Sequence, residues 1–230
     1  MRLPNLLNHF KMNPASPKIK VCGLTQTNQA QSLTDSGVDF IGFIFYEKSP
    51  RFVLNSLSLK EIAEIPHLKK VGVFVNEKLD KIVEIANDAH LNLIQLHGDE
   101  DRQFIIDLKT KSGKNIEIIK VIRIGDQNQE ELQNVISQFS ETPDYFLFDT
   151  DSSAFGGTGK TFDWRILNQI EIPKPYFLSG GISLKNIGEI KTINQKPYAL
   201  DINSKFEIEP GIKNLDKIKS FQNTLRNHDL

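Results

Sequence analysis

A repeated alternation along the chain constrains its fold more than any other feature. Short apolar runs rich in Val, Ile and Phe are each followed by a longer stretch in which apolar residues recur at helical spacing. The runs predict strands at residues 19–22, 40–45, 70–75, 93–96, 116–122, 145–148, 176–178 and 198–202. The longer stretches predict helices at 27–36, 57–65, 78–89, 100–111, 129–139, 162–169, 183–191 and 215–225. Eight strand–helix units in 230 residues predict an α/β fold, a single-domain (β/α)8 TIM barrel.

The same alternation would also suit an open, doubly wound sheet. Length favours the closed barrel, because eight units in a chain this short approach the ~250 residues usual for that fold. Most strands are continuous apolar runs, as expected for a parallel sheet buried on both faces. Residues 1–17 hold three prolines and no periodic pattern, so we expect an irregular extension before a barrel domain at 18–230. Asp99 and Asp163 are expected to begin the fourth and sixth helices as N-caps.

Charge and cysteine content argue against several classes of protein. Twenty-eight Lys and Arg against 29 Asp and Glu leave a net charge of −1, which gives no electrostatic reason to bind nucleic acid or an acidic membrane. No apolar run approaches the ~20 residues that cross a bilayer. Cys22 is the only cysteine, so no internal disulfide can form, and we expect a cytoplasmic protein. The five histidines lack ligand spacing, so no metal is expected, and the absence of heptads favours a monomer.

Three residues near the carboxyl ends of the predicted strands are candidates for chemistry, because barrel enzymes build their active sites there. Cys22 could abstract a proton if a cation lowered its pKa, although a lone cysteine is more often an inert core residue. Asp149 could act as a general acid if burial raised its pKa, or could simply start a turn. Arg51 lies on the loop after the second strand, where its planar fork could clamp a carboxylate, or it is an ordinary surface arginine.

Other strand ends supply candidates for ligand binding. Gln95 and His97 alternate with apolar residues, so both should point into the barrel or its mouth, and a structural histidine is an equal alternative. Glycines after the seventh strand and polar residues after the eighth mark the loops where barrels commonly bind phosphate. A glycine-rich segment at 155–161 matches only the end of the nucleotide-binding pattern, because Ala154 stands at its first glycine. We therefore do not expect a nucleotide triphosphatase.

Several blocks together resemble phosphoribosylanthranilate isomerase, a family of tryptophan biosynthesis. The blocks are KVCGLT at 20–25, GFIFY at 42–46, SPRFV at 49–53, QLHGD at 95–99, GGTGKTFDW at 156–164 and LSGGI at 178–182. Their order and spacing fit the family, and the resemblance spans residues 18–214. It implies an isomerase that converts N-(5-phosphoribosyl)anthranilate to 1-(2-carboxyphenylamino)-1-deoxyribulose 5-phosphate. This Amadori rearrangement is the third step from chorismate in the tryptophan pathway.

The resemblance also implies roles for individual residues, with a small-molecule phosphosugar as the partner and no cofactor. Asp149 matches the general acid, Cys22 the general base and Arg51 the contact to the anthranilate carboxylate. The remaining positions are those lining the sugar (Gln95, His97 and Asp201), those holding the phosphate (Gly180, Gly181, Asn203 and Ser204) and those of a lid loop (Gly156, Gly157 and Gly159).

Two positions depart from the family pattern, and two other functions stay open. Glu47 stands where proline is usual, and Lys205 where glycine is common. One alternative is another phosphosugar barrel enzyme, which would use paired Asp and His with a metal or a Lys and Glu set. The other is a non-catalytic barrel that binds a phosphate ligand, since a fold alone never proves an activity. The pair Cys22 and Asp149 favours the isomerase over both.

Overall fold

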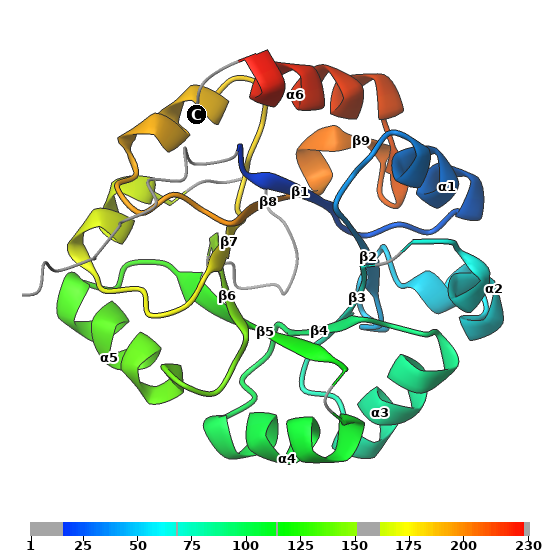
Figure 1. Ribbon diagram of the computed structural model, residues 1–230, viewed down its shortest axis with the longest axis horizontal. Helices are drawn as coiled ribbons and strands as arrows, with labels where there is room; N and C mark the ends of the chain where they lie inside the picture. The colour runs from blue at the N-terminus through cyan, green and yellow to red at the C-terminus, as the bar shows by residue number, and fades with distance from the viewer. Residues whose placement is uncertain (1–15, 68, 114, 151–161, 228–230) are drawn as a thin grey trace, which may run out of the picture.

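Eight parallel strands close into a barrel in sequence order, with helices around the outside (Figure 1). The computed structural model describes residues 16–67, 69–113, 115–150 and 162–227, so the extension expected at 1–17 lies almost wholly outside the described residues. The strands are β1 (Lys18–Val21), β2 (Phe40–Ile44), β3 (Lys70–Phe74), β4 (Leu93–Leu96), β5 (Glu117–Ile124), β6 (Tyr145–Thr150), β7 (Tyr176–Leu178) and β8 (Ala199–Ile202). The predicted (β/α)8 barrel is confirmed.

Six α-helices and four short 3-10 helices accompany the strands in the described residues. The α-helices are α1 (Thr27–Asp35), α2 (Leu59–Glu64), α3 (Leu79–Asp88), α4 (Arg102–Ser112), α5 (Gln129–Phe139) and α6 (Leu215–Asn227). The 3-10 helices are η1 (Val53–Asn55), η2 (Trp164–Gln169), η3 (Ile187–Thr192) and η4 (Ser204–Phe206). The α-helices expected at 162–169 and 183–191 are therefore wrong in type. Helix α2 is equally short, but it begins with a capping box, which η2 and η3 lack, and η3 also contains Gly188, a poor helix former.

The beginning of α4 corrects one predicted cap. Asp101, not Asp99, precedes the first helical residue, and its side chain accepts a hydrogen bond from the backbone N–H of Phe104 at 2.8 Å. Asp99 instead pairs with Arg123 and accepts a hydrogen bond from a neighbouring asparagine side chain. The other predicted cap is confirmed, because the Asp163 side chain accepts from the backbone N–H at the start of η2 at 3.0 Å.

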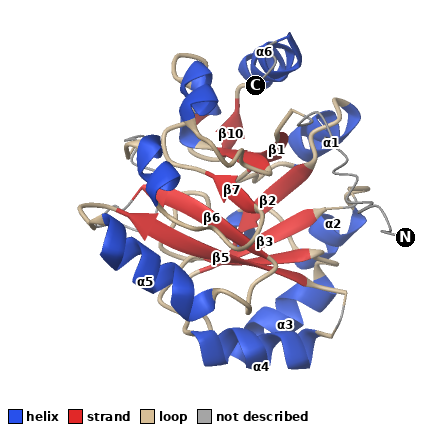
Figure 2. Ribbon diagram, turned by 60° about the vertical axis from the view of Figure 1, so that its left-hand side comes forward, coloured by secondary structure: helices blue, strands red, loops and turns tan. Residues whose placement is uncertain are grey.

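A small hairpin after β8 has no counterpart in the predicted elements. Strand β9 (Glu207–Glu209) pairs with β10 (Ile212–Lys213) in antiparallel orientation, and Pro210 and Gly211 form the turn. Figure 2 shows β10 near β1 and α6. A Pro-Gly pair is a recognised turn signal, but strands of two and three residues are too short to produce an alternating pattern.

The barrel interior divides into an apolar half and a polar half. The apolar half lies toward the amino ends of the strands and contains Phe40, Val71, Leu93, Ile119, Val121, Tyr145, Leu147, Phe177 and Ala199. Two residues further along three strands, the inward positions are polar: Gln95 in β4, Asp149 in β6 and Asp201 in β8. A separate apolar layer packs the strands against the outer helices. None of the described helices is long and apolar enough to cross a membrane.

Candidate active site

A pocket lies at the carboxyl ends of the strands, with an empty volume of about 760 Å³ that includes the open solvent at its mouth. The residues predicted for catalysis, sugar binding and phosphate binding all line it: Cys22, Arg51, Gln95, His97, Asp149, Gly180, Gly181, Asp201, Asn203 and Ser204. They come from six different strands or the loops after them, as in other barrel enzymes. The predicted lid residues, Gly156, Gly157 and Gly159, lie outside the described residues.

Asp149 is suited to proton transfer near neutral pH. Its carboxyl group is 15% exposed at the mouth of the barrel, and the backbone N–H of Thr150 donates to Oδ1 at 2.9 Å. Burial, and next the negative charge of Asp201, raise the pKa of Asp149 to about 6. A carboxylic acid with such a pKa keeps a substantial protonated fraction at the pH where a general acid must act.

A chain of hydrogen bonds fixes the side chain of His97 next to Asp149. The Lys20 ammonium donates to Gln95 Oε1 at 2.7 Å, so the Gln95 amide nitrogen faces His97 Nδ1 at 3.1 Å. Nδ1 therefore accepts, and the ring hydrogen lies on Nε2, which is 3.4 Å from Asp149 Oδ2. Burial and nearby cations lower the pKa of His97 to about 3, which keeps the ring neutral. His97 is thus a neutral donor toward Asp149.

The Cys22 thiol is buried directly after β1, among opposing influences on its ionisation. Burial raises the pKa of Cys22 above its ordinary value, and the positive charges of Lys20 and Lys213 oppose that shift only in part. We predicted a cation near this thiol as the condition for a reactive thiolate. The cations are present, but burial outweighs their effect on the thiol.

Lys20 is a site residue that was absent from the predicted set. Its side chain is completely buried, and Nζ lies 3.0 Å from Asp201 Oδ2. A sequence signal existed, because a lysine stands between Ile19 and Val21 in the apolar run predicted at 19–22, and lysine is rarely buried without a partner. The second carboxylate oxygen of Asp201, Oδ1, is buried and has no hydrogen-bond partner among the described residues. Since Asp201 lines the pocket, this oxygen is available to accept from a ligand hydroxyl.

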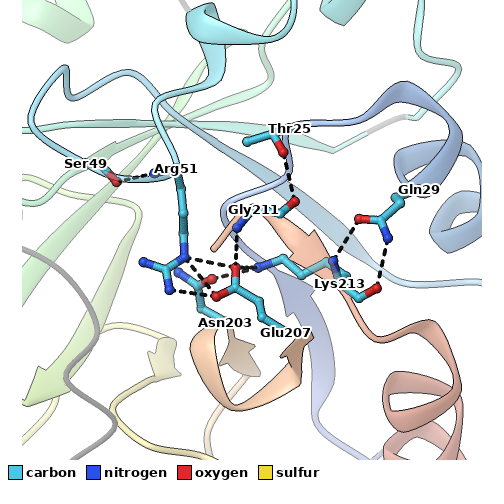
Figure 3. A network of polar contacts seen from close by, with 8 residues as sticks. All are labelled: Thr25, Gln29, Ser49, Arg51, Asn203, Glu207, Gly211 and Lys213. Carbon is cyan, nitrogen blue, oxygen red and sulfur yellow. Dashed lines mark hydrogen bonds and ion pairs between the residues drawn. The ribbon is translucent and has the colours of Figure 1, made fainter. Parts of the chain in front are cut away.

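Arg51 is buried against a carboxylate of the protein itself. Its Nε lies 2.9 and 3.1 Å from the two carboxylate oxygens of Glu207, and its Nη2 lies 2.6 Å from Oε2 (Figure 3). The two side chains are 9% and 4% exposed, so Arg51 is no ordinary surface arginine. Glu207 was also absent from the predicted site, because its strand in the hairpin was not recognised.

Two loops offer backbone donors to an anion. Gly180 and Gly181 have φ of +83° and +70°, a left-handed conformation that glycine adopts without strain. A Cβ at residue 180 would lie 2.4 Å from Thr150 Oγ1, so only glycine fits. The N–H groups of Gly180 and Gly181 meet no acceptor in the described part of the chain. Across the pocket, Ser204 begins η4, and the first N–H groups of a helix are also free to bind an anion.

The two departures from the family pattern do not disrupt this geometry. Glu47 is exposed in a turn that is closed by a hydrogen bond of 2.9 Å from the Ser49 N–H to the Tyr46 carbonyl. Ser49 in turn accepts from the backbone N–H of Arg51 at 3.1 Å, so the loop still presents Arg51 to the pocket. Lys205 is exposed at the edge of the pocket, where its charge adds to the attraction for an anion.

A family model described as N-(5'phosphoribosyl)anthranilate (PRA) isomerase matches residues 19–224. The chain belongs to this family. The N-(5'-phosphoribosyl)anthranilate isomerase of Petrotoga mobilis is 42% identical over 205 residues, which cover 88% of this chain and 93% of the relative. The phosphoribosylanthranilate isomerase family resemblance found in the sequence is therefore confirmed, and the chain is an isomerase of tryptophan biosynthesis.

Solved structures of family members agree with the barrel. The crystal structure of phosphoribosyl anthranilate isomerase from Thermotoga maritima has a TM-score of 0.74 at 33% identity, covering 92% of this chain and all of that one. A phosphoribosyl anthranilate isomerase in complex with reduced 1-(o-carboxyphenylamino)-1-deoxyribulose 5-phosphate has a TM-score of 0.71 at 30% identity, with the same coverage.

Proposed function

We propose that the protein catalyses the Amadori rearrangement of N-(5-phosphoribosyl)anthranilate to 1-(2-carboxyphenylamino)-1-deoxyribulose 5-phosphate. One observation carries the proposal: Asp149 and Cys22 line the same pocket, with a buried arginine and two anion-binding loops around them. The substrate has an aryl carboxylate at one end and a phosphate at the other, and its reacting carbons lie between them. The family relationship and the neighbour in complex with a reduced product analogue support the same substrate class.

Asp149 is the proposed general acid. Its proton passes to the furanose ring oxygen, the C1–O bond breaks, and the ring opens to a Schiff base. The pKa of about 6 supports this role, because the group can hold the proton near neutral pH and release it as the bond breaks. The Nε2–H of His97 then faces the carboxylate that remains and stabilises its negative charge.

Cys22 is the proposed general base, which removes the C2 proton of the Schiff base to give an enolamine. The enolamine tautomerises to the ketone product, so the sequence moves protons only and includes no cofactor or metal. The buried ammonium of Lys20 interacts with the thiol and stabilises the thiolate form. Lys20 therefore has a proposed electrostatic role in making the base.

The remaining proposed contacts orient the substrate. Arg51 binds the anthranilate carboxylate, and the backbone N–H groups of Gly180, Gly181 and Ser204 bind the phosphate. Asp201 accepts a sugar hydroxyl through its unpartnered Oδ1, while Gln95, His97 and Asn203 complete the lining. The lid formed by the loop at 156–159, the cytoplasmic location and the monomeric state stay predictions.

The test follows the enzyme-dependent fall in anthranilate-type fluorescence with freshly made phosphoribosylanthranilate. We expect turnover by the wild type and a loss of at least ~100-fold in kcat for Cys22→Ala, as for removal of a general base. Arg51→Ala should mainly raise KM, because that residue positions the aryl carboxylate. Glu84→Gln removes a carboxylate on the exposed face of α3 and is the control that should match the wild type.

Each result has a distinct meaning. Wild-type turnover that persists in Cys22→Ala would keep the reaction and remove Cys22 from the mechanism. An unchanged KM in Arg51→Ala would assign the carboxylate to another residue. No turnover by folded wild-type protein would contradict the proposed function itself.

A further inference from the structure

A cluster of three buried charges lies behind the pocket at the position of Arg51. We call Arg51, Glu207 and Lys213 the Arg51 cluster. Glu207 receives two hydrogen bonds to Oε1 in addition to its contacts with Arg51, one from Lys213 Nζ at 2.6 Å and one from the N–H of Gly211 at 3.1 Å. Lys213 Nζ also donates to Asn203 Oδ1 at 2.7 Å, and its side chain is completely buried.

The first helix holds this cluster in place from behind (Figure 3). Gln29 in α1 accepts from the N–H of Lys213 and donates to its carbonyl, both at 2.8 Å. Thr25 donates to the carbonyl of Gly211 at 2.8 Å. The hairpin formed by β9 and β10 is therefore fixed to the segment that follows β1. From this support Glu207 contacts Arg51, and Lys213 contacts Glu207.

Close packing restricts where the Arg51 side chain can lie. A Cβ at Gly23 would stand 2.7 Å from Arg51 Cδ, and Gly23 has φ of +75°. The arginine stem thus runs across a backbone position that only glycine allows.

The hydrogen bonds leave one edge of the guanidinium for a ligand. Glu207 occupies Nε and one hydrogen of Nη2, whereas Nη1 has no acceptor among the described residues. Arg51 lines the pocket, and Glu207 does not. A guanidinium held at one edge by a protein carboxylate can still bind a second carboxylate end-on through Nη1 and Nη2.

Charge explains why Lys213 belongs to the cluster. Arg51 and Glu207 alone form a neutral pair, which would give little attraction for an anionic group that has lost its water. The Lys213 ammonium returns the cluster to a net charge of +1. Burial lowers the pKa of Lys213, but Glu207, its nearest carboxylate, opposes that shift and favours the charged form.

We propose that Glu207 and Lys213 are positioning residues for recognition of the substrate's aryl carboxylate: Glu207 orients the guanidinium of Arg51, and Lys213 supplies the net positive charge that the carboxylate meets. This inference rests on the proposed function, because it takes Arg51 as the contact to that carboxylate. It adds a reason for the hairpin after β8, which otherwise lies outside the barrel.

The test measures binding and needs no turnover, so effects of Lys213 on the ionisation of Cys22 do not enter. The ligands are reduced 1-(2-carboxyphenylamino)-1-deoxyribulose 5-phosphate and its phenyl counterpart without the carboxylate, titrated calorimetrically. We expect Lys213→Met to lower the affinity for the carboxylated ligand at least ~10-fold and the affinity for the phenyl ligand less than ~3-fold. Only the carboxylated ligand carries the negative group that the Lys213 charge attracts. Lys219→Met removes a lysine from the exposed face of α6 and should change neither.

A double variant separates charge from structure. Glu207→Gln combined with Lys213→Met leaves Arg51 as the only charge, so the net charge returns to +1, and we expect part of the lost affinity for the carboxylated ligand to return. A purely structural role predicts the opposite, because the double variant disturbs the contacts of two buried side chains instead of one. In steady state, Lys213→Met should raise KM by a larger factor than it lowers kcat.

Thermal melts first establish that each variant folds, and Lys213→Gln serves as a second neutral variant that keeps a donor toward Glu207. The proposal would be overturned if the neutral variants lost affinity for both ligands equally, or if the double variant recovered no affinity for the carboxylated ligand. Wild-type turnover, measured separately, distinguishes this result from failure of the proposed function. If Arg51→Ala also binds both ligands as the wild type does, the carboxylate lies elsewhere, and the inference fails together with that contact.

Discussion

The two halves of the barrel interior use the same strand geometry for opposite purposes. In the apolar half, Phe177 packs edge-to-face against Phe40 and Tyr145, with ring centroids 5.2 and 5.4 Å apart. In the polar half, Lys20 and Asp201 form a buried ion pair next to a thiol. Apolar burial stabilises the closed barrel, whereas burying a carboxylate or an ammonium costs free energy unless its partners compensate.

The change from the apolar half to the polar half occurs between two successive inward positions of one strand. Leu147 and Asp149 lie two residues apart on the same face of β6. Leu147 is fully buried in the apolar half, while Asp149 lies in the pocket with a pKa of about 6. Position along the strand, and not the strand itself, therefore decides whether an inward side chain stabilises the barrel or lies in the pocket.

Loss of a ring from the apolar half should have the strongest effect on stability. Phe177→Ala removes a fully buried ring in contact with three other aromatic rings, and we expect the free energy of unfolding to fall by ~3–5 kcal/mol. Because Phe177 does not line the pocket, kcat per folded molecule should stay close to that of the wild type. Urea titration and turnover at low temperature measure the two quantities. A loss of kcat with unchanged stability would contradict the assignment of stability to the apolar half and chemistry to the polar half.

Asp149→Asn should give the opposite pair of results. We expect kcat to fall at least ~100-fold, about 2.7 kcal/mol in barrier, because the general acid is lost. Stability at neutral pH should rise, by at most ~3 kcal/mol, since a carboxyl group with a folded pKa of about 6 is penalised when it ionises in the folded protein.

The gain in stability of Asp149→Asn should depend on pH in a definite direction. A raised carboxyl pKa means that the folded protein holds the proton more strongly than the unfolded chain, so the penalty is complete above pH 6 and disappears as both states become protonated below pH ~4. Urea titrations of Asp149→Asn and the wild type at pH 7.5 and 3.5 measure it. Equal differences in stability at both pH values would contradict the assigned pKa.

The barrel could be predicted from the sequence because most inward and outward positions of a buried parallel strand are apolar, which gives a signal that recurs with each strand. The candidate site followed from the strand ends, where Cys22, His97 and Asp149 interrupt those runs. The family resemblance supplied their expected roles.

The supporting charges could not be found in this way. Glu207 and Lys213 belong to strands of three and two residues, too short for a pattern. Both lie far along the chain from Arg51, which Glu207 contacts directly and Lys213 through Glu207. Nor could the sequence predict that burial would outweigh Lys20 in setting the pKa of Cys22, since that depends on the depth of the thiol in the folded barrel.

The pH profile of kcat/KM tests the polar half as a unit. The proposed reaction needs Asp149 protonated and Cys22 ionised, although the pKa of the acid, about 6, lies below the raised pKa of the thiol. Below pH 6, Asp149 stays protonated while the thiolate fraction falls about tenfold per pH unit, so kcat/KM falls with it. Between the two pKa values the loss of acid offsets the gain of thiolate, and the profile is flat. Above the thiol pKa it falls again.

The profile is measured with the wild type under conditions where substrate is far below KM. A steady rise from pH 6 to 9, without a plateau, would show that Asp149 is not needed in its protonated form. The same plateau shape with Asp149→Asn would show that the acid limb belongs to another group.

The smallest effect concerns the cation beneath the thiol. Lys20→Met removes the charge that most favours the thiolate, so the pKa of Cys22 should rise and its alkylation by iodoacetamide at pH 8 should slow several-fold. Lys18→Met is the matched control, because Lys18 lies two residues earlier on the same strand, where it donates to the Tyr198 hydroxyl at 2.8 Å. The control should leave alkylation unchanged. Similar alkylation rates in Lys20→Met and Lys18→Met would mean that the Lys20 charge has no special influence on the Cys22 thiol. Ionisation of the thiol would then depend on bound substrate.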